Sequence, residues 1–252
     1  MLNVKDLSFP IAKPPWTQLG RHLESLTRKA IYEFQMLEGI EAVSIALSGG
    51  KDSLTLLFLL HAMMGKGLPQ LPIYAIHVDG EFSCGPGISL GYLKGICKEL
   101  GVEFISVVSS KKREELECYS CSRERRRLLF EKAIEVGAPT IAFGHHRDDS
   151  VQTLLLNLLH KGEFEAILPV VPMHDFGIKI IRPLIYIPEN EIREFAKMYG
   201  FTRITCMCSV GQDSKRKKAD LLLDKLQEEF PHARANLFHA AQKFGTQKAL
   251  KK

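Results

Sequence analysis

The apolar positions of this chain alternate between short continuous runs and stripes with helical spacing. β-Branched runs typical of buried strands occur at 42–47, 72–78, 103–108 and 140–143. Stripes with helical spacing follow them at 53–60, 88–100, 122–136 and 149–159. Strict alternation of strand and helix favours a parallel sheet with right-handed crossovers. We therefore expect an α/β fold, a doubly wound and mainly parallel five-stranded sheet with helices on both faces.

The two ends of the chain depart from this alternation. An amphipathic stripe over 19–37 predicts a helix behind a Pro-rich, extended arm. Segments 168–172 and 178–182 predict a hairpin or a strand pair, whose first arm the prolines push to an edge. Further helices are expected at 188–199, 215–229 and 232–243. The predicted units are an N-terminal arm and helix (1–38), an α/β domain (39–200), and a C-terminal cysteine loop with helices packed on that domain (201–252).

The most specific motif is Ser48-Gly49-Gly50-Lys51-Asp52-Ser53, between the first predicted strand and its helix. Glycines allow a tight turn and a close approach to a ligand, and the free N–H groups at a helix start bind phosphate. The adjacent glycines exclude the Walker spacing, and the Rossmann spacing fails as well. All six residues are therefore candidate nucleotide contacts, and Lys51 and Asp52 are also candidate catalytic residues.

Candidate nucleotide contacts also follow the next strands, where a parallel sheet places its ligand crevice. His77 and Asp79 end the second strand, from which Asp79 would reach a ribose or a magnesium ion. Gly144 and His145 follow the fourth strand. These four residues extend the predicted nucleotide site beyond the phosphate loop.

Two adjacent carboxylates, Asp148 and Asp149, come next and are candidate catalytic residues. Such a pair suits a hard cation such as Mg²⁺ that bridges phosphate oxygens, or a proton transfer. The alternative is that one of the two caps the helix that follows.

Four of the six cysteines form two close pairs. Cys118 and Cys121 have C-x-x-C spacing, and with one distal cysteine they would ligate an iron–sulfur cluster. Either Cys206 or Cys208 would supply the distal ligand, and we favour Cys208 because it lies closer to Gly211-Gln212. All four would also satisfy tetrahedral zinc, and a persulfide relay between Cys121 and Cys208 is a third interpretation. Cys97 lies in an apolar helical pattern and is predicted to be a packed thiol.

Basic runs follow both cysteine pairs. The candidate RNA-binding residues are Arg123, Arg125, Arg126 and Arg127 after the first pair, and Lys215, Arg216, Lys217 and Lys218 after the second. A charged run is usually only a solvated face, but two runs around one reaction centre suit an RNA phosphate funnel.

The overall composition adds little to this picture. The chain has 34 Lys and Arg against 29 Asp and Glu among 252 residues, and a formal charge of +5 does not by itself indicate nucleic acid. No apolar stretch reaches membrane-spanning length, so we expect a soluble, cytoplasmic protein without a membrane partner.

The phosphate motif resembles the PP-loop of the ATP pyrophosphatases, which transfer AMP to an oxygen and release pyrophosphate. Combined with Gly144–Asp149, the Cys118–Cys121 pair and Ile181-Arg182-Pro183-Leu184, it resembles the tRNA 2-thiocytidine synthetase (TtcA-type) branch over about 19–242. The resemblance implies the PP-loop, adenine nucleotide alpha hydrolase-like fold. It also implies ATP- and Mg²⁺-dependent replacement of the C2 oxygen of a tRNA anticodon-loop cytidine by sulfur, with a 4Fe-4S cluster on three cysteines.

On this hypothesis Lys51, Arg182 and Mg²⁺ stabilise charge on the α-phosphate as pyrophosphate leaves. The expected partners are tRNA, a sulfur donor such as a cysteine desulfurase, and a second copy of the chain in a homodimer. One alternative is another PP-loop enzyme that adenylates tRNA for a different thiolation or for a lysidine-type reaction. The other is a zinc-containing nucleotide-binding protein without turnover.

Overall fold

The computed structural model describes residues 9–79, 90–109, 118–201 and 215–245, with the backbone alone for 118–122. Its strands are β1 (Val43–Ala46), β2 (Ile73–Asp79), β3 (Glu103–Val108), β4 (Thr140–Ala142), β5 (Val170–Met173) and β6 (Ile178–Ile181). Its helices are α1 (Gln18–Glu33), α2 (Lys51–Met63), α3 (Leu90–Leu100), α4 (Cys118–Glu135), α5 (Arg147–Lys161), α6 (Glu189–Met198), α8 (Lys215–Glu229) and α9 (Ala233–Phe244), with a short 3₁₀ turn η3 (His174–Phe176).

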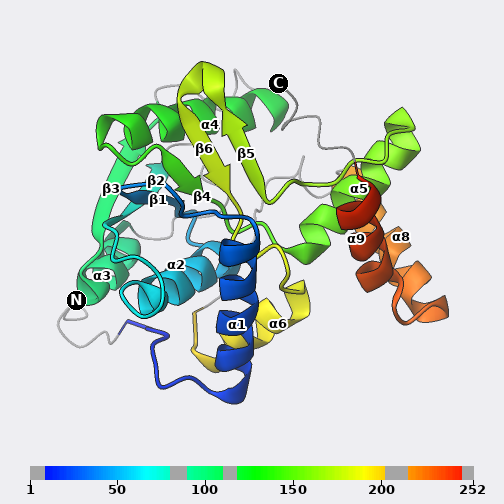
Figure 1. Ribbon diagram of the computed structural model, residues 1–252, viewed down its shortest axis with the longest axis horizontal. Coiled ribbons are helices and arrows are strands. Elements are labelled where there is room, and N and C mark those ends of the chain that lie inside the picture. The colour runs from blue at the N-terminus through cyan, green and yellow to red at the C-terminus, as the bar shows by residue number, and fades with distance from the viewer. Residues whose placement is uncertain (1–8, 80–89, 110–117, 202–214, 246–252) are drawn as a thin grey trace, which may run out of the picture.

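These strands form one sheet in the order β3-β2-β1-β4-β6-β5 (Figure 1). Every pairing is parallel except that of β5 with β6. The predicted α/β fold with a mainly parallel sheet is therefore confirmed. The sheet has six strands rather than five, because both arms of the predicted hairpin join it. Pro172 lies in β5 at the sheet edge, where a missing N–H is tolerated.

Helices cover both faces of the sheet. On one face, an apolar core joins α1, α2, α3 and α6. On the other face, Leu129, Phe130 and Ala133 of α4 pack on Ile76 and Ile180 of the sheet. Cys97 is fully buried in α3, and burial raises the pKa of its thiol to about 12, which confirms the predicted packed thiol. None of the helices described is long and apolar enough to cross a membrane.

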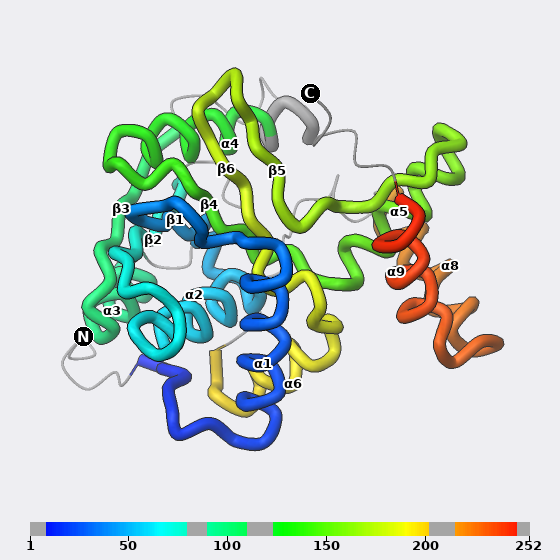
Figure 2. The backbone as a smooth tube through the Cα atoms, in the orientation of Figure 1, coloured from blue at the N-terminus to red at the C-terminus, as the bar shows by residue number. Residues whose placement is uncertain are grey.

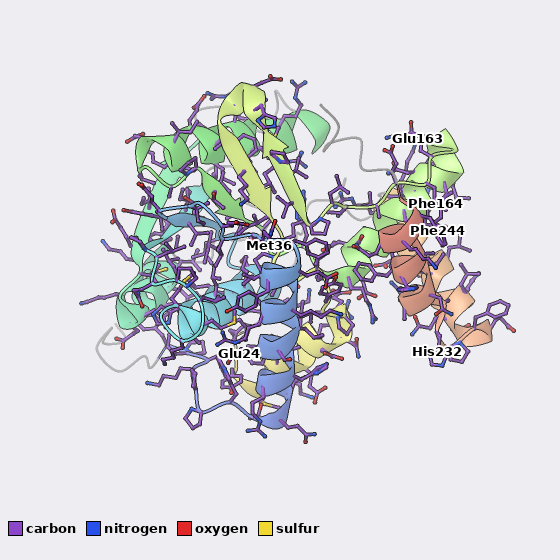
Figure 3. All side chains as sticks on the ribbon, viewed as in Figure 1. Glu24, Met36, Glu163, Phe164, His232 and Phe244 are labelled. Atoms are coloured by element: carbon purple, nitrogen blue, oxygen red, sulfur yellow. The ribbon has the colours of Figure 1, made fainter. Side chains whose placement is uncertain are left out.

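The last two helices contribute only Ala219, Leu223 and Phe238 to the buried residues of the main core. Both α8 and α9 contact α5, and the three project to one side of the sheet (Figure 2). Phe244 at the end of α9 lies beside Phe164, and His232 marks the opposite end of that helix (Figure 3). The division of the chain into the three predicted units stays a prediction.

The strand order fixes where a ligand can bind. From β1 the chain proceeds to β2 and β3 on one side, and it then returns to β4 and β6 on the other. At such a reversal the connections after two neighbouring strands diverge and leave a crevice at their carboxyl ends. The loops after β1 and β4 flank this crevice, and they carry the phosphate motif and Gly144–Asp149.

Candidate active site

The loop after β1 is wound around the hydroxyl group of Ser53. Its Oγ accepts the Gly49 N–H at 3.1 Å, donates to the Gly50 carbonyl at 3.0 Å, and lies 3.1 Å from Ser48 Oγ. Gly49 has a φ of 81°, a left-handed conformation that glycine adopts without strain. No side chain caps the start of α2 at Gly50, so its first N–H groups are available for an anion.

A cavity of about 390 Å³ opens beside this loop at the carboxyl ends of the strands. It is lined by Ser48, Asp52 and Ser53 from the phosphate loop, Gly144, His145 and Asp149 from the β4–α5 connection, Arg125, Arg126 and Leu129 from α4, Arg216 from α8, and the strand or strand-end residues Ala46, Leu47, Ile76, Val78 and Phe143. Parts of both basic runs thus meet the phosphate loop in one cavity.

Gly144 is required by the close approach of the two loops. A Cβ atom on Gly144 would lie 2.9 Å from the carbonyl carbon of Asp52 and 3.0 Å from the Ser53 nitrogen. These are backbone atoms of the first turn of α2, which cannot rotate away. Only glycine therefore fits here without displacing the phosphate loop.

His145 is a neutral imidazole beside a buried cation. Arg182 Nε donates to its Nδ1 at 3.3 Å, so the ring proton belongs on Nε2. Burial and the charge of Arg182 lower the pKa of His145 to about 4. Burial and the neighbouring Arg126 lower the pKa of Arg182 to about 10, so its guanidinium stays charged at neutral pH. The guanidinium of Arg182 therefore places a permanent positive charge next to His145. The Nε2–H of His145 is a neutral hydrogen-bond donor at the cavity wall.

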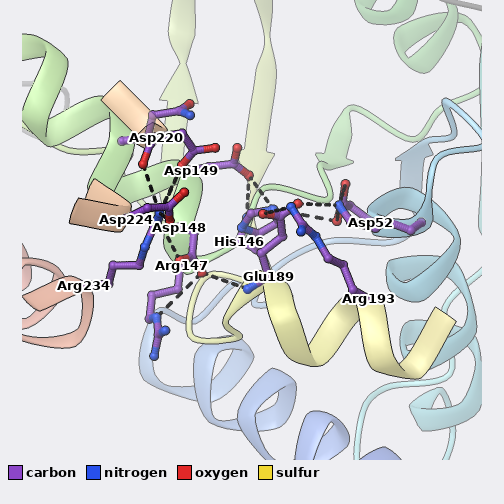
Figure 4. Close-up of polar contacts among 12 residues, drawn as sticks. Asp52, His146, Arg147, Asp148, Asp149, Glu189, Arg193, Asp220, Asp224 and Arg234 are labelled. Carbon is purple, nitrogen blue, oxygen red and sulfur yellow. Dashed lines mark hydrogen bonds and ion pairs between the residues drawn. The ribbon is translucent and has the colours of Figure 1, made fainter. Parts of the chain in front are cut away.

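The two adjacent carboxylates, Asp148 and Asp149, have different surroundings. Asp149 Oδ2 accepts the His146 N–H at 3.0 Å at the start of α5, and its side chain lines the cavity. Asp148 lies outside the cavity lining. Its Oδ2 accepts the Glu189 N–H at 2.8 Å, and its Oδ1 pairs with Arg234 Nη1 at 3.2 Å (Figure 4). These contacts favour a structural role for Asp148 and leave Asp149 as the carboxylate that faces a ligand.

His146, which the sequence did not single out, lies between two carboxylates of the site. It is 5% exposed, and its Nε2 lies 3.5 Å from Asp149 Oδ2 and 3.7 Å from Asp52 Oδ1. It thus links the phosphate loop to the start of α5. Only its place within the Gly144–Asp149 cluster marks it in the sequence.

The ammonium group of Lys51 pairs with two carboxylates, and Lys51 is not among the residues that line the cavity. Its Nζ lies 2.8 Å from Asp52 Oδ1 and 3.0 Å from Glu189 Oε1. Burial opposes the charge of Lys51, but the two carboxylates outweigh it and raise the pKa of Lys51. Glu189 is the second site residue absent from the sequence prediction, because at the start of a predicted helix it showed only a helix-start signal.

Neither His77 nor Asp79 lines the cavity. Successive strand residues face opposite sides of a sheet, and Ile76 and Val78 are the β2 residues at the cavity. His77 is buried and hydrogen-bonds the Leu47 carbonyl at 2.7 Å, which fixes the strand end before the phosphate loop. Nucleotide contacts by these two residues stay predictions.

Only part of the basic runs faces the cavity. Arg125, Arg126 and Arg216 line it. Arg127 instead pairs with Glu124 at 2.7 Å and with Glu131 at 2.5 Å along the outside of α4. Lys215, Lys217 and Lys218 are exposed beside Arg216 in the first turn of α8, and Arg123 is exposed on α4. Cations are unfavourable at the positive end of a helix dipole, so this position does not serve helix stability.

The proximal cysteines lie at the beginning of α4. Cys118 is its first residue, and Cys121 comes one turn later, a spacing that fits two ligands of one metal centre. Arg125, which lines the cavity, follows Cys121 by four residues, a rise of about 6 Å along the helix axis. Cys206 and Cys208 lie outside the described residues. Among those that are described, no group of three His, Cys, Asp or Glu side chains is placed to hold a metal ion.

Comparison with known proteins agrees with this geometry. The PP-loop domain model matches residues 18–205. The chain belongs to the PP-loop family. A tRNA-cytidine(32) 2-sulfurtransferase from Cupriavidus metallidurans is 36% identical over 232 residues, 88% of this chain and 73% of that protein. One from Syntrophotalea carbinolica is 32% identical over 88% of this chain and 89% of that protein. The predicted TtcA-type branch is thus confirmed.

A solved PP-loop enzyme shares the fold. The U34-tRNA thiolase NcsA from Methanococcus maripaludis, determined with its [4Fe-4S] cluster, superposes with a TM-score of 0.71. The match covers 89% of this chain and 79% of that chain at 23% sequence identity. The two chains therefore share the same overall fold.

Proposed function

We propose that this chain is an ATP-dependent tRNA sulfurtransferase that replaces the C2 oxygen of an anticodon-loop cytidine with sulfur. The observation that carries the proposal is the shared cavity, which Arg125, Arg126 and Arg216 line together with the phosphate loop. A nucleotide site needs its phosphate loop, but three further arginines at its mouth suit a second polyanion. The sulfurtransferase relatives supply the reaction class.

The proposed reaction has two steps. The C2 oxygen of cytidine attacks the α-phosphorus of ATP, and pyrophosphate leaves. A sulfur nucleophile then attacks C2, the C–O bond breaks, and AMP leaves with that oxygen. Lys51, Arg182 and the first N–H groups of α2 stabilise negative charge on the phosphates. Ser48, Gly49, Gly50 and Ser53 shape the phosphate cradle.

We assign Mg²⁺ to the carboxylate of Asp149 at the cavity wall, because hard cations prefer carboxylate and phosphate oxygens. We choose Asp149 rather than Asp148 as the Mg²⁺ ligand because both oxygens of Asp148 already have other partners. Asp149→Asn is expected to raise the Mg²⁺ concentration for half-maximal pyrophosphate release, whereas an unchanged Mg²⁺ dependence would refute the assignment.

We assign a 4Fe-4S cluster to Cys118, Cys121 and Cys208, with Cys206 as the alternative third ligand. The cluster would supply an iron with an open coordination position for the sulfur. Protein purified without air should be brown and should bleach on oxidation. A colourless anaerobic preparation with stoichiometric zinc would refute the cluster and favour the zinc alternative.

The decisive experiment is mass analysis of tRNA nucleosides from cells that lack this protein. Loss of 2-thiocytidine, restored by the wild-type gene and not by Lys51→Met, is the expected result. Unchanged 2-thiocytidine would refute the reaction and favour another PP-loop modification. The cysteine desulfurase as sulfur donor, the homodimer and the cytoplasmic location remain predictions.

A further inference from the structure

Glu189 is the first residue of α6 and connects two helices at the active site. Its backbone N–H donates to Asp148 Oδ2 at 2.8 Å, and Pro188 precedes it in an extended conformation. Its Oε1 lies 3.0 Å from Lys51 Nζ, and its Oε2 accepts from Arg193 Nη2 at 2.8 Å. Both backbone and side chain of Glu189 are therefore held, and both carboxylate oxygens have cationic partners.

The ammonium group of Lys51 has three N–H donors, and two carboxylates hold it in this structure. Asp52 accepts at 2.8 and 3.0 Å through its two oxygens, and Glu189 lies at 3.0 Å. Asp52 adjoins Lys51 in sequence and moves with it. Glu189 comes from another helix, so it is the contact that ties the ammonium of Lys51 to α6.

We propose that Glu189 is a positioning residue that fixes the ammonium of Lys51 at the phosphate loop, and that Asp148 acts through Glu189 by holding the first N–H of α6. This rests on the proposed function, in which Lys51 binds the phosphates of ATP. A lysine side chain loses much rotational freedom when it binds a phosphate. Because Asp52 and Glu189 occupy all three N–H donors in this structure, a phosphate must take the place of one acceptor. The acceptors that remain keep the ammonium restricted, which reduces that entropy cost and strengthens ATP binding.

The charge state of Glu189 agrees with this role. Burial favours the neutral carboxyl, but the charge of Lys51 and its hydrogen bond, with that of Arg193, outweigh burial and lower the pKa of Glu189 to about 2. Glu189 is therefore ionised throughout the physiological pH range. The substitution Glu189→Gln keeps the shape of this side chain and removes its charge.

A double-mutant cycle on the full-length protein tests the proposal. The affinity for Mg-ATP is measured by calorimetry for the wild type, Glu189→Gln, Lys51→Met and the double variant, without tRNA. Glu189→Gln should weaken ATP binding about tenfold in the wild-type background and less than twofold when Lys51 is already methionine. In tRNA-dependent pyrophosphate release, the same variant should raise KM for ATP and leave KM for tRNA within about twofold.

Glu194→Gln is the matched control, the same chemical change at an exposed position of the same helix. This control should change neither the affinity for Mg-ATP nor the KM for ATP. A tenfold loss for Glu189→Gln that persists in the Lys51→Met background would overturn the proposal, because Glu189 would then act only by tying α6 to the fold. Unchanged ATP affinity in Glu189→Gln would overturn it too.

These outcomes separate the inference from the proposed function. Coupling between Glu189 and Lys51 in a protein that forms no 2-thiocytidine would refute the sulfurtransferase reaction alone. Additive effects in a protein that does form 2-thiocytidine would refute the positioning role alone. A wild-type protein that does not bind Mg-ATP would refute both.

Discussion

The helix that follows the phosphate loop and the C-terminal helices differ in how much apolar packing holds them in the fold. Ten of the 13 residues of α2 are buried, and eight of them belong to the main apolar core. Only Ala219 and Leu223 are buried among the 15 residues of α8. The free energy gained by burying apolar surface is proportional to the buried area. A displacement of α2 would therefore expose much of the core, whereas a displacement of α8 would expose little apolar surface.

Ion pairs add to a small apolar contact at the C-terminal helices, which contribute Ala219, Leu223 and Phe238 to the core. Arg234 of α9 is 11% exposed in its side chain and lies between Asp148 at 3.2 Å and Asp224 at 2.7 Å, with Asp220 at 3.4 Å. It thus joins α8 and α9 to the start of α5, next to the catalytic cavity. The comparison indicates a rigid nucleotide site beside C-terminal helices that are held largely by charges and that we propose to contact RNA, and the following predictions test it.

The largest effect is expected at the rigid side, from Gly144→Ala. The new Cβ would meet the backbone of Asp52 and Ser53 at 2.9 to 3.0 Å, so the phosphate loop must move. A displacement of about 1 Å costs on the order of 100-fold in activity, measured as tRNA-dependent pyrophosphate release. Near-wild-type activity would show that the nucleotide site is not rigid.

The control for that variant is Gly162→Ala at the other end of α5. Gly162 has a φ of +68° with nothing within 4 Å of a Cβ. Alanine there should lower the free energy of unfolding by about 1 kcal/mol through backbone strain and leave ATP affinity unchanged.

The next largest effect is expected from Arg234→Met, which removes the cation that joins the C-terminal helices to α5. Three carboxylates would lose their shared partner, and we expect a loss of about 2 kcal/mol in the free energy of unfolding. Affinity for tRNA should fall more than affinity for ATP, measured by filter binding and calorimetry. Equal losses of both would show that the two parts are not separable.

A smaller effect is expected from single cavity arginines. Arg126→Gln should weaken tRNA binding and lower the slope of log affinity against log salt by about one. Arg127→Gln is its control on the same helix, because Glu124 and Glu131 already bind that guanidinium. A larger effect at Arg127 than at Arg126 would contradict the cavity as the RNA site.

The smallest effect concerns pH. The pKa of His145 is lowered from 6.5 to about 4, so the unfolded chain binds a proton there before the folded protein does. The stability due to neutral His145 is complete above about pH 6.5 and is lost as the pH falls towards 4. His145→Asn should reduce the fall in Tm over this window by about 3 °C. A parallel pH profile would contradict a buried neutral histidine.

The chemistry of the site was predictable where the motif is continuous in sequence. The phosphate loop is six adjacent residues whose turn and helix start are set by local conformational preferences. The sixth strand was not counted, because joining a sheet depends on β6 pairing with β4, a contact between distant segments. The two adjacent aspartates could not be told apart, because their roles depend on Glu189 and Arg234, 40 residues or more away.

The sequence by itself determined the family, the nucleotide-binding chemistry and the alternating α/β architecture, because these rest on local motifs and on periodicity. Only the tertiary structure decided that Arg126 faces the cavity while Arg127 pairs along α4, and that Glu189 meets Lys51. Those assignments depend on which side of a helix faces the sheet and on crossovers that bring distant residues within hydrogen-bonding distance, and no local pattern encodes either.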